Sequence, residues 1–185
     1  MMQKRVITGI IVVFLMLAGQ NWAGSRSTGD FGGAPKSPVL EHSESAPSLS
    51  NVVRVVDGDT IVVLVDGVAE KVRLIGVNTP ETVDPRRPVQ CFGKEASAFT
   101  KSLLENKTIH LESDASQGDR DKYGRLLRYV LLTDGSLINE KIIAEGYGNE
   151  YTYRNPYKYQ KEFKKAERDA RNSQKGLWAQ GICTH

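Results

Sequence analysis

The sequence predicts an α+β domain dominated by β-structure, namely a five-stranded Greek-key barrel that carries three α-helices. Two observations predict this fold. Five short runs are rich in β-branched residues, and three other runs have helical spacing, the first of them between the third and fourth β-runs. This order, β-β-β-α-β-β-α-α, is typical of small barrels of the oligonucleotide/oligosaccharide-binding (OB) type. A sandwich would need more strands, and a βαβ fold would need more alternation.

The first three strands are predicted to form a meander. Residues 52–56, 60–65 and 71–77 each consist largely of valine, isoleucine and leucine. Asp66-Gly67 separates the second run from the third and is a strong signal for a two-residue hairpin turn. We therefore expect the second and third strands to pair antiparallel.

A helix is predicted over residues 93–105, after the three strands. Ala96, Phe99 and Leu103 recur there at i, i+3 and i+7, which puts them on one face. Two further strands are predicted at residues 108–112 and 126–132, and the Asp134-Gly135 turn ends the second of them.

Two helices are predicted to complete the fold. The first covers residues 137–145 and is ended by Gly146. The second covers residues 157–174, with Gly176 just past its end. Its inward-facing residues are expected to be Tyr159, Phe163, Ala166 and Ala170.

The N-terminal region has the pattern of a secretory signal peptide over residues 1–23. Lys4 and Arg5 precede an apolar run from Val6 to Gly19, and a small residue follows near Ala23. This run is shorter than the roughly 20 apolar residues of a transmembrane helix. An uncleaved membrane anchor is the alternative, because the sequence before Ala23 matches the small-x-small cleavage pattern poorly.

A composition shift separates this region from the folded domain. Residues 24–50 are dominated by Gly, Ser, Pro and Ala, so we expect a disordered linker. Residues 51–185 are then expected to form a single domain. The whole chain is 39% hydrophobic and 25% charged, as in soluble globular proteins, and its formal charge of +3 permits a polyanionic partner without requiring one.

Several common catalytic signatures are absent from the sequence. It contains no GxSxG, Walker A, HExxH or GxGxxG motif. His42, His110 and His185 do not have metal-ligand spacing, so neither a histidine zinc site nor a Ser-His-Asp triad is expected. The two cysteines cannot form a four-cysteine zinc site.

Three charged clusters remain, each at one end of a predicted strand. They are the segment 57–60 (DGDT), Arg73 with the segment 78–82 (NTPET), and the segment 121–125 (DKYGR). Each has a structural alternative. The first could be a glycine turn, Arg73 could point to solvent from its strand, and the third could be a charged loop.

Taken together, these motifs resemble the thermonuclease (micrococcal nuclease) family. DGDT, an arginine strand leading into NTPET, FGKEASAFTK and DKYGR follow one another in the family's order, and the resemblance extends from Val52 to Trp178. The resemblance implies the same barrel fold. It also implies hydrolysis of phosphodiester bonds in DNA and RNA, with release of 3′-phosphate ends.

The resemblance also implies catalytic roles. Glu81 would act as general base or position the attacking water, and Arg73 and Arg125 would clamp the scissile phosphate. A planar guanidinium suits this task because it offers paired donors to phosphate oxygens and stays charged.

The same resemblance implies a Ca2+ site formed by Asp59, Asn78 and the backbone carbonyl of Thr79, since calcium prefers oxygen ligands. The best-known family pattern has an aspartate where this chain has Asn78. Because the amide lacks the negative charge, we expect weaker or less selective metal binding.

Substrate contacts follow from the same comparison. Tyr123, Tyr151 and Tyr153 resemble aromatic residues around the family's nucleotide pocket, although tyrosines at a barrel rim could equally be core residues with one wet end. No element looks able to read base edges in a duplex, so we expect only a mild preference for unpaired or flexible strands. Candidate backbone-phosphate contacts are Lys122, Arg86 and Arg87; the last two could equally belong to a solvated basic loop.

Cys91 and Cys183 are the only cysteines. In an exported chain, an even pair favours a disulfide, which here would connect the start of the first helix to the C-terminus. A catalytic cysteine is not expected, because no histidine is placed to serve it.

The sequence therefore predicts a secreted or periplasmic, calcium-dependent, sugar-nonspecific endonuclease that acts as a monomer. Two alternatives stay open. One is a catalytically weak or inactive barrel that only binds single-stranded nucleic acid. The other is an oligosaccharide-binding barrel. The domain lacks the exposed tryptophans that would favour it, since Trp178 is its only tryptophan.

Overall fold

The computed structural model describes residues 49–86 and 88–183. The predicted signal peptide, nearly all of the predicted linker and Arg87 lie outside the described residues. Strand β1 begins at Leu49, so residues 49 and 50, predicted as the end of the linker, belong to the folded domain.

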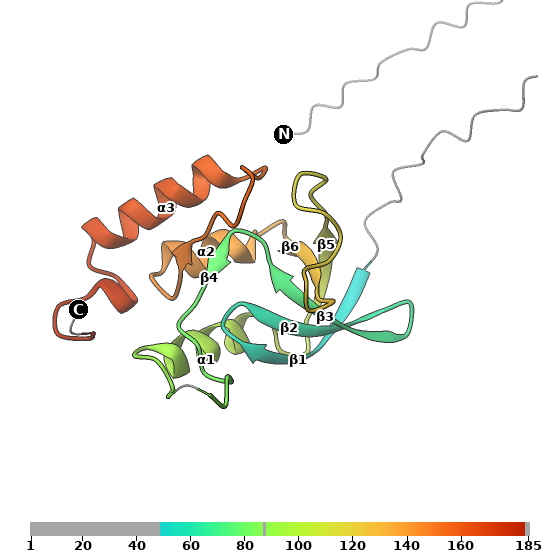
Figure 1. Ribbon diagram of the computed structural model, residues 1–185, viewed down its shortest axis with the longest axis horizontal. Coiled ribbons are helices and arrows are strands. Elements are labelled where there is room, and N and C mark those ends of the chain that lie inside the picture. Colours follow the sequence, from blue (N-terminus) through green and yellow to red (C-terminus); the bar gives the residue numbers. More distant parts are fainter. Residues whose placement is uncertain (1–48, 87, 184–185) are drawn as a thin grey trace, which may run out of the picture. The chain divides into compact units, whose positions relative to one another are not determined.

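Five strands form the closed barrel at the centre of this domain (Figure 1). β3 and β6 pair in parallel, whereas the other neighbouring strands are antiparallel. The predicted β-dominated barrel with three helices is confirmed. In their order around the barrel the strands are β1 (Leu49–Asp57), β2 (Thr60–Val65), β3 (Val68–Leu74), β6 (Leu126–Leu132) and β5 (Thr108–Glu112).

The turn between β2 and β3 has the predicted hairpin geometry. Asp66 and Gly67 both have positive φ angles, 50° and 79°, as a type I′ turn requires. The register that follows from this turn pairs Thr60 with Arg73. The end of the DGDT segment therefore lies beside the arginine of the third strand.

The predicted strand 71–77 is wrong as a continuous element. β3 ends at Leu74, and Gly76 then turns the chain with a φ of 74°. A Cβ atom at Gly76 would lie 2.6 Å from Cζ of Tyr157, so the aromatic ring packs directly on the backbone. The sequence pattern did not reveal this break, because Ile75 and Val77 on either side are buried apolar residues, as in a strand.

Beyond the break, the chain forms a small second sheet that was not predicted. It consists of β4 (Val77–Asn78) and β7 (Asn149–Glu150), paired antiparallel. Two residues per strand are too few to produce an alternating pattern that a sequence would reveal.

The three helices are α1 (Gly93–Leu104), α2 (Ile138–Ala144) and α3 (Gln160–Asn172). α2 contacts both β6 and α3, and α1 contacts β1 (Figure 1). One continuous core joins barrel residues such as Ile61 and Val72 to helix residues such as Ile142 and Phe163. Within the described residues, no helix is long and apolar enough to cross a membrane.

The predicted faces of two helices can be compared with the observed ones. In α3, Phe163, Ala166 and Ala170 are buried as expected. In α1 the most buried face runs through Ala96, Thr100 and Leu104, while the predicted Phe99 and Leu103 are only partly buried. Thr100 was not predicted because it is polar; its hydroxyl donates a 2.7 Å hydrogen bond to the Gly58 carbonyl.

The predicted glycine ends of the helices are correct for α2 and wrong for α3. Gly146 follows α2 in the left-handed conformation, with a φ of 75°. After α3 this conformation is adopted by Gln174 instead, with a φ of 52°. Gly176 begins a short 3-10 helix, η1 (Gly176–Trp178), and approaches Gly146 so closely that a Cβ atom would lie 2.3 Å from its carbonyl oxygen.

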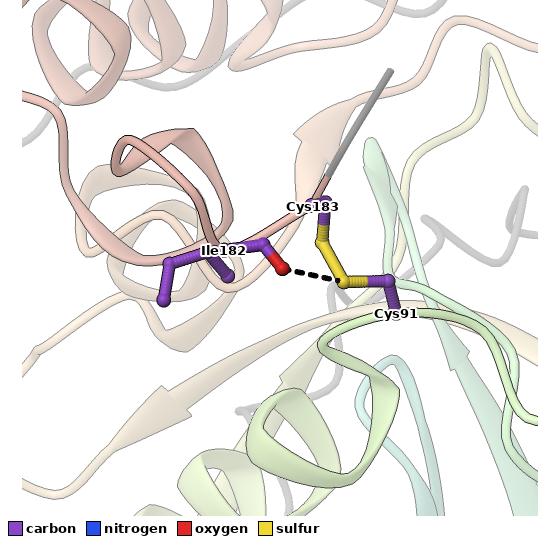
Figure 2. The surroundings of a disulfide bond; sticks show 3 residues. All are labelled: Cys91, Ile182 and Cys183. Atoms are coloured by element: carbon purple, nitrogen blue, oxygen red, sulfur yellow. Dashed lines mark hydrogen bonds between the residues drawn. A yellow bond between two sulfur atoms is a disulfide. The ribbon is translucent and has the colours of Figure 1, made fainter.

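A disulfide joins Cys91, two residues before α1, to Cys183 near the C-terminus (Figure 2). The two Cα atoms are 5.9 Å apart, and the bond closes a separation of 92 residues. This is the pairing expected from the sequence. Sγ of Cys91 also lies 3.1 Å from the Ile182 carbonyl oxygen; an oxidised sulfur has no proton, so it makes a close contact there without donating.

Candidate active site

Strand register brings the three charged clusters of the sequence together. The DGDT segment connects β1 to β2, and Thr60 pairs with Arg73 of β3. The pairing of β3 with β6 then brings the segment 121–125, which precedes β6, next to Arg73. Residues up to 65 positions apart in the chain therefore make direct hydrogen bonds in this region.

Asp59 is the most connected carboxylate of the site. Its Oδ2 accepts hydrogen bonds from the backbone N–H of Thr79 (3.0 Å) and the Thr79 hydroxyl (3.2 Å). The same oxygen lies 3.1 Å from Nη2 of Arg73, and Oδ1 accepts from the Thr60 hydroxyl at 3.0 Å. These contacts leave Asp59 buried, with its orientation set by three neighbouring segments.

The Arg73 side chain lies inside the structure, so the solvent-facing alternative is wrong. Its side chain is 14% exposed. Nη1 donates to the carbonyls of Leu74 (3.1 Å) and Val77 (2.7 Å), and Nη2 reaches Oδ1 of Asn78 at 3.5 Å as well as Asp59. Both terminal nitrogens of Arg73 are therefore engaged with protein oxygens.

Arg125 is held differently, from a loop. Its Nε donates to Oδ2 of Asp121 at 2.6 Å, and its Nη1 lies 3.4 Å from the Thr60 hydroxyl. Burial of the Asp121 carboxyl opposes ionisation, but hydrogen bonds from Arg125 and from the backbone of Tyr123 outweigh it and lower the pKa of Asp121. Asp121 thus stays ionised and orients Arg125.

The segment 121–125 is itself tied to the barrel by Arg120. Nη1 and Nη2 of Arg120 donate to the two carboxylate oxygens of Glu70 in β3, each at 2.9 Å. Nη1 also donates to the Gly124 carbonyl at 2.8 Å. Arg120 was not predicted as part of the site, because a lone arginine before a motif gives no signal of its partner 50 residues earlier.

Glu81 lies on the loop that leads from β4 to α1. Its Oε1 accepts from the backbone N–H groups of Val83 (2.7 Å) and Asp84 (3.2 Å). Partial burial acts to raise the pKa of Glu81, but the hydrogen bonds from the backbone and the influence of the neighbouring Asp57 carboxyl outweigh it, so the pKa is lowered from its ordinary value. Glu81 is therefore a carboxylate at neutral pH, as a proton acceptor must be.

Asp57 is a site residue to which the sequence pattern assigned no role beyond a turn. It is buried, and this burial raises its pKa to about 6. Oδ1 accepts from the Thr82 hydroxyl and from the Gly58 N–H, both at 2.8 Å. Of the two neighbouring carboxyls, Asp57 therefore has the higher pKa and takes up a proton before Glu81 as the pH falls.

The oxygens that the resemblance assigns to a metal are suited to a hard cation. Asp59 Oδ2 and Asn78 Oδ1 both point at the same cationic nitrogen, Nη2 of Arg73, at 3.1 and 3.5 Å. With the Thr79 carbonyl that the resemblance adds, the set would consist only of oxygens, which Ca2+ prefers. The set holds one carboxylate, and the described residues contain no group of three His, Cys, Asp or Glu side chains that could hold a metal.

A pocket of about 580 Å³ opens beside this cluster. Arg73 and Asn78 line it on one side, and Arg125 and Lys122 on another. Asp59 and Glu81 are not among the described residues that line it, nor is Arg86, whose side chain is 83% exposed and pairs with Asp84 at 2.8 Å.

The three predicted tyrosines also line this pocket. Tyr123 is 72% exposed, Tyr153 59% and Tyr151 43%, so the alternative that they are core residues is wrong. Arg154 is a further lining residue that was not predicted, and its guanidinium lies 5.2 Å from the ring centre of Tyr153. The neighbouring positions of Tyr153 and Arg154 in the sequence could have indicated this pair.

Comparison with known proteins finds relatives among nucleases. The family model described as staphylococcal nuclease homologue matches residues 71–180. A thermonuclease of Staphylococcus hyicus is 40% identical over 176 residues, which cover 95% of this chain and 99% of the relative. A thermonuclease of Staphylococcus intermedius is 39% identical over 95% of this chain and 98% of its own.

A relative from another genus matches as well. Endonuclease YncB of Bacillus subtilis is 39% identical over 142 residues, which cover 75% of this chain and 66% of the relative. The match of the family model to more than half of the chain, and the nearly full-length similarity to two thermonucleases, lead to one conclusion: the chain belongs to the staphylococcal nuclease (thermonuclease) family.

Proposed function

We propose that this chain is an exported, calcium-dependent endonuclease that cleaves both DNA and RNA and leaves 3′-phosphate ends. Family membership makes the chain a nuclease, that is, a phosphodiester hydrolase acting on nucleic acid. The proposed calcium dependence, substrate range and product ends rest on the site. The observation that carries the proposal is that Arg73 of β3 and Arg125 of the loop before β6 both reach the DGDT segment, at Asp59 (3.1 Å) and Thr60 (3.4 Å).

Two guanidinium groups beside one pocket suit a phosphodiester substrate. The charge that develops on the phosphoryl oxygens during hydrolysis is stabilised by fixed cations. Arg125 lines the pocket and is partly exposed, so its terminal nitrogens can bind a phosphate oxygen directly. Arg73 contributes positive charge from the buried side of the same pocket.

Glu81 would accept the proton of the attacking water. Its lowered pKa keeps it ionised at neutral pH. Asp59, Asn78 and the Thr79 carbonyl would hold the calcium ion, which when bound supplies positive charge to the phosphoryl oxygens.

The exposed tyrosines support a substrate with accessible bases. Rings of Tyr123, Tyr151 and Tyr153 can stack on bases of any sequence, and each stacked base typically contributes about 1–3 kcal/mol. Bases in a duplex are not free to stack in this way. We therefore propose a preference for single-stranded or flexible regions, with Lys122 contacting the phosphate backbone and the enzyme acting as a monomer.

Export is supported by two independent features. The N-terminal 23 residues have the pattern of a signal peptide, with an uncleaved anchor as the alternative. The Cys91–Cys183 disulfide fits an oxidising compartment, because cytosolic thiols are usually kept reduced.

One assay on single-stranded DNA tests the mechanism. The wild-type enzyme is measured with calcium and with EGTA, and Glu81→Gln is measured with calcium. We expect EGTA to abolish cleavage and Glu81→Gln to lower kcat by about 100-fold or more, since general-base catalysis typically contributes that much. Sensitivity of the product ends to a 3′-phosphatase tests the cleavage polarity.

Three outcomes would contradict the proposal. Cleavage that survives both EGTA and Glu81→Gln would exclude this mechanism. Binding of single-stranded DNA without any cleavage by the wild type would identify a non-catalytic binding module. Product ends that resist the 3′-phosphatase would exclude release of 3′-phosphate.

A further inference from the structure

The loop that carries Glu81 is closed by a pair of hydrogen bonds at its base. The backbone N–H of Glu81 donates to the side-chain Oε1 of Gln90 at 2.8 Å, and the backbone N–H of Gln90 donates to the carbonyl of Glu81 at 2.9 Å. Gln90 thus binds both polar groups of the Glu81 backbone. Residues 81–90 form a closed loop, and the orientation of the Glu81 peptide depends on the position of Gln90.

Gln90 is itself exposed to solvent. Water competes for exposed hydrogen bonds, so this pair would hold the loop only weakly if residue 90 were free to move. A second constraint is needed to keep Gln90 beside Glu81.

That constraint lies next to Gln90, at Cys91. The disulfide from Cys91 to Cys183 fixes the chain directly after Gln90 (Figure 2). Two residues further on, α1 begins at Gly93, which packs so closely that a Cβ atom would lie 2.7 Å from Cγ2 of Thr82 and 3.3 Å from the Glu81 carbonyl oxygen. Cys91, which carries the disulfide, therefore lies between Gln90 and Gly93, the two residues that contact the Glu81 segment.

The C-terminal segment around Cys183 is also held by this disulfide. Residues 179–183 follow η1, and their backbone hydrogen bonds are local, from Ala179 to Gly176 (3.1 Å) and from Ile182 to Ala179 (3.3 Å). The bond to Cys91 thus connects this terminal segment to the Glu81 loop. Cleaving the disulfide would remove the covalent link between the two segments.

We propose that Gln90 is a positioning residue for Glu81, and that the Cys91–Cys183 disulfide holds Gln90 in place, so that full nuclease activity requires the oxidised enzyme. This inference rests on the proposed role of Glu81. A base displaced by about 1 Å can lose up to about 100-fold in rate, so a modest loosening of this loop is sufficient. The enzyme is then less active before export, while its cysteines are reduced.

The reducing step involves only the disulfide and an added dithiol. A small dithiol transfers two electrons and two protons to the Cys91–Cys183 bond, which becomes two thiols, while the dithiol becomes a cyclic disulfide. No catalytic residue changes its chemistry in this step.

The test compares four proteins, each before and after reduction by a dithiol, in calcium on single-stranded DNA. They are the wild type, Gln90→Ala, Gln90→Glu and Val89→Ala. Val89 is the half-exposed neighbour on the same loop, so its variant is the matched control. Gln90→Glu retains an acceptor oxygen for the Glu81 N–H and serves as the conservative replacement.

We expect Gln90→Ala to lower kcat about tenfold, with KM within about twofold. The reason is that Glu81 is displaced, while the residues that bind the phosphates and nucleobases of the substrate are untouched. Reduction lowers kcat of the wild type and of Val89→Ala by a similar factor. It has little further effect on Gln90→Ala, because the disulfide acts through Gln90. Gln90→Glu retains most of the activity.

Circular dichroism confirms at assay temperature that each protein is folded, and Cys91→Ser/Cys183→Ser replaces reduction if the dithiol interferes. Equal loss on reduction in Gln90→Ala and the wild type would overturn the coupling. Unchanged kcat in Gln90→Ala would overturn the positioning role. If Glu81→Gln were as active as the wild type, the proposed function would fail instead, so the two failures are distinguishable.

Discussion

The inner half of the site and its rim hold their arginines in different ways. The inner half consists of Asp59 and Arg73 at the ends of barrel strands, with Asn78 and Thr79 at the end of β4. Both terminal nitrogens of Arg73 are engaged with protein oxygens. The rim consists of residues 120–125, where Arg125 is held by Asp121 and by a long contact to Thr60.

The difference indicates a division of labour. Arg73 stabilises the barrel end by satisfying the carbonyls of Leu74 and Val77, and its Nη2 lies between the two side-chain oxygens that would bind calcium. Arg125 is oriented by one carboxylate and retains donors that face the pocket. Loss of Arg73 should therefore affect folding and catalysis, whereas loss of Arg125 should affect catalysis alone.

The largest expected effect is on rate, and it applies to both arginines. Arg73→Lys and Arg125→Lys should each lower kcat by about 100-fold or more. An ammonium at position 125 cannot offer paired planar donors to the phosphate, and one at position 73 cannot keep the contacts that fix the positive charge of Arg73 beside the pocket. Steady-state cleavage of single-stranded DNA in saturating calcium measures this. Full activity in either lysine variant would exclude that arginine from the phosphate clamp.

Stability should separate the two arginines. Arg73→Lys should lower the free energy of unfolding by about 2 kcal/mol, because buried carbonyl and carboxylate oxygens lose their donors. Arg125→Lys should change it by less than about 1 kcal/mol, as for other partly exposed ion pairs. Urea denaturation without metal gives both values, and equal destabilisation would remove the distinction between inner half and rim.

The inner half should also respond to pH, through the neighbouring Asp57. Burial raises the pKa of Asp57 to about 6 from an ordinary value of 3.8, so the folded protein keeps a proton that the unfolded chain releases first. Stability from this group is complete below about pH 4 and is lost as the pH rises through about 6, by an amount on the order of 2 kcal/mol.

Asp57→Asn should not undergo this loss, since the amide resembles the protonated carboxyl and does not titrate. The variant should match the wild type at pH 4 and be more stable at pH 7. Urea denaturation of both proteins in EDTA at these two pH values measures the difference. If the difference in unfolding free energy between the variant and the wild type were the same at both pH values, Asp57 would not titrate in this range.

The smallest expected effect concerns calcium. Asn78→Asp adds a negative charge within 3.5 Å of Nη2 of Arg73 and beside Asp59. The calcium concentration for half-maximal activity should fall by about tenfold, because affinity in such sites increases with ligand charge. Titration of the rate with calcium in the wild type and the variant measures this, and an unchanged requirement would mean that residue 78 is not a ligand.

Much of the fold could be predicted because local patterns agree with it. Asp66-Gly67 specifies a hairpin wherever it lies between two strands, and the predicted bounds of β2, β5 and β6 are those observed. The break at Gly76 could not be predicted, because its cause is the ring of Tyr157, 81 residues further along the chain.

The site shows the same limit. The motifs indicated Arg73, Glu81 and Arg125 through a resemblance. They did not indicate the raised pKa of the buried Asp57, the ion pair of Arg120 with Glu70, or the hydrogen bonds of Gln90 with Glu81. Each of these roles depends on burial or on a distant partner. Neither property is encoded in the spacing of neighbouring residues.

By itself, the sequence determined the helices and most of the barrel strands, the barrel class and the residue types available for phosphate and cation binding, because these follow from periodicity and side-chain chemistry within short segments. Only the tertiary structure decided that the Arg73 side chain is turned away from solvent, that burial raises the pKa of Asp57, and that Gln90 lies between Glu81 and the disulfide. Those properties arise from strand register and helix packing, which bring segments far apart in the chain into contact and change the energy of each charge by burying it.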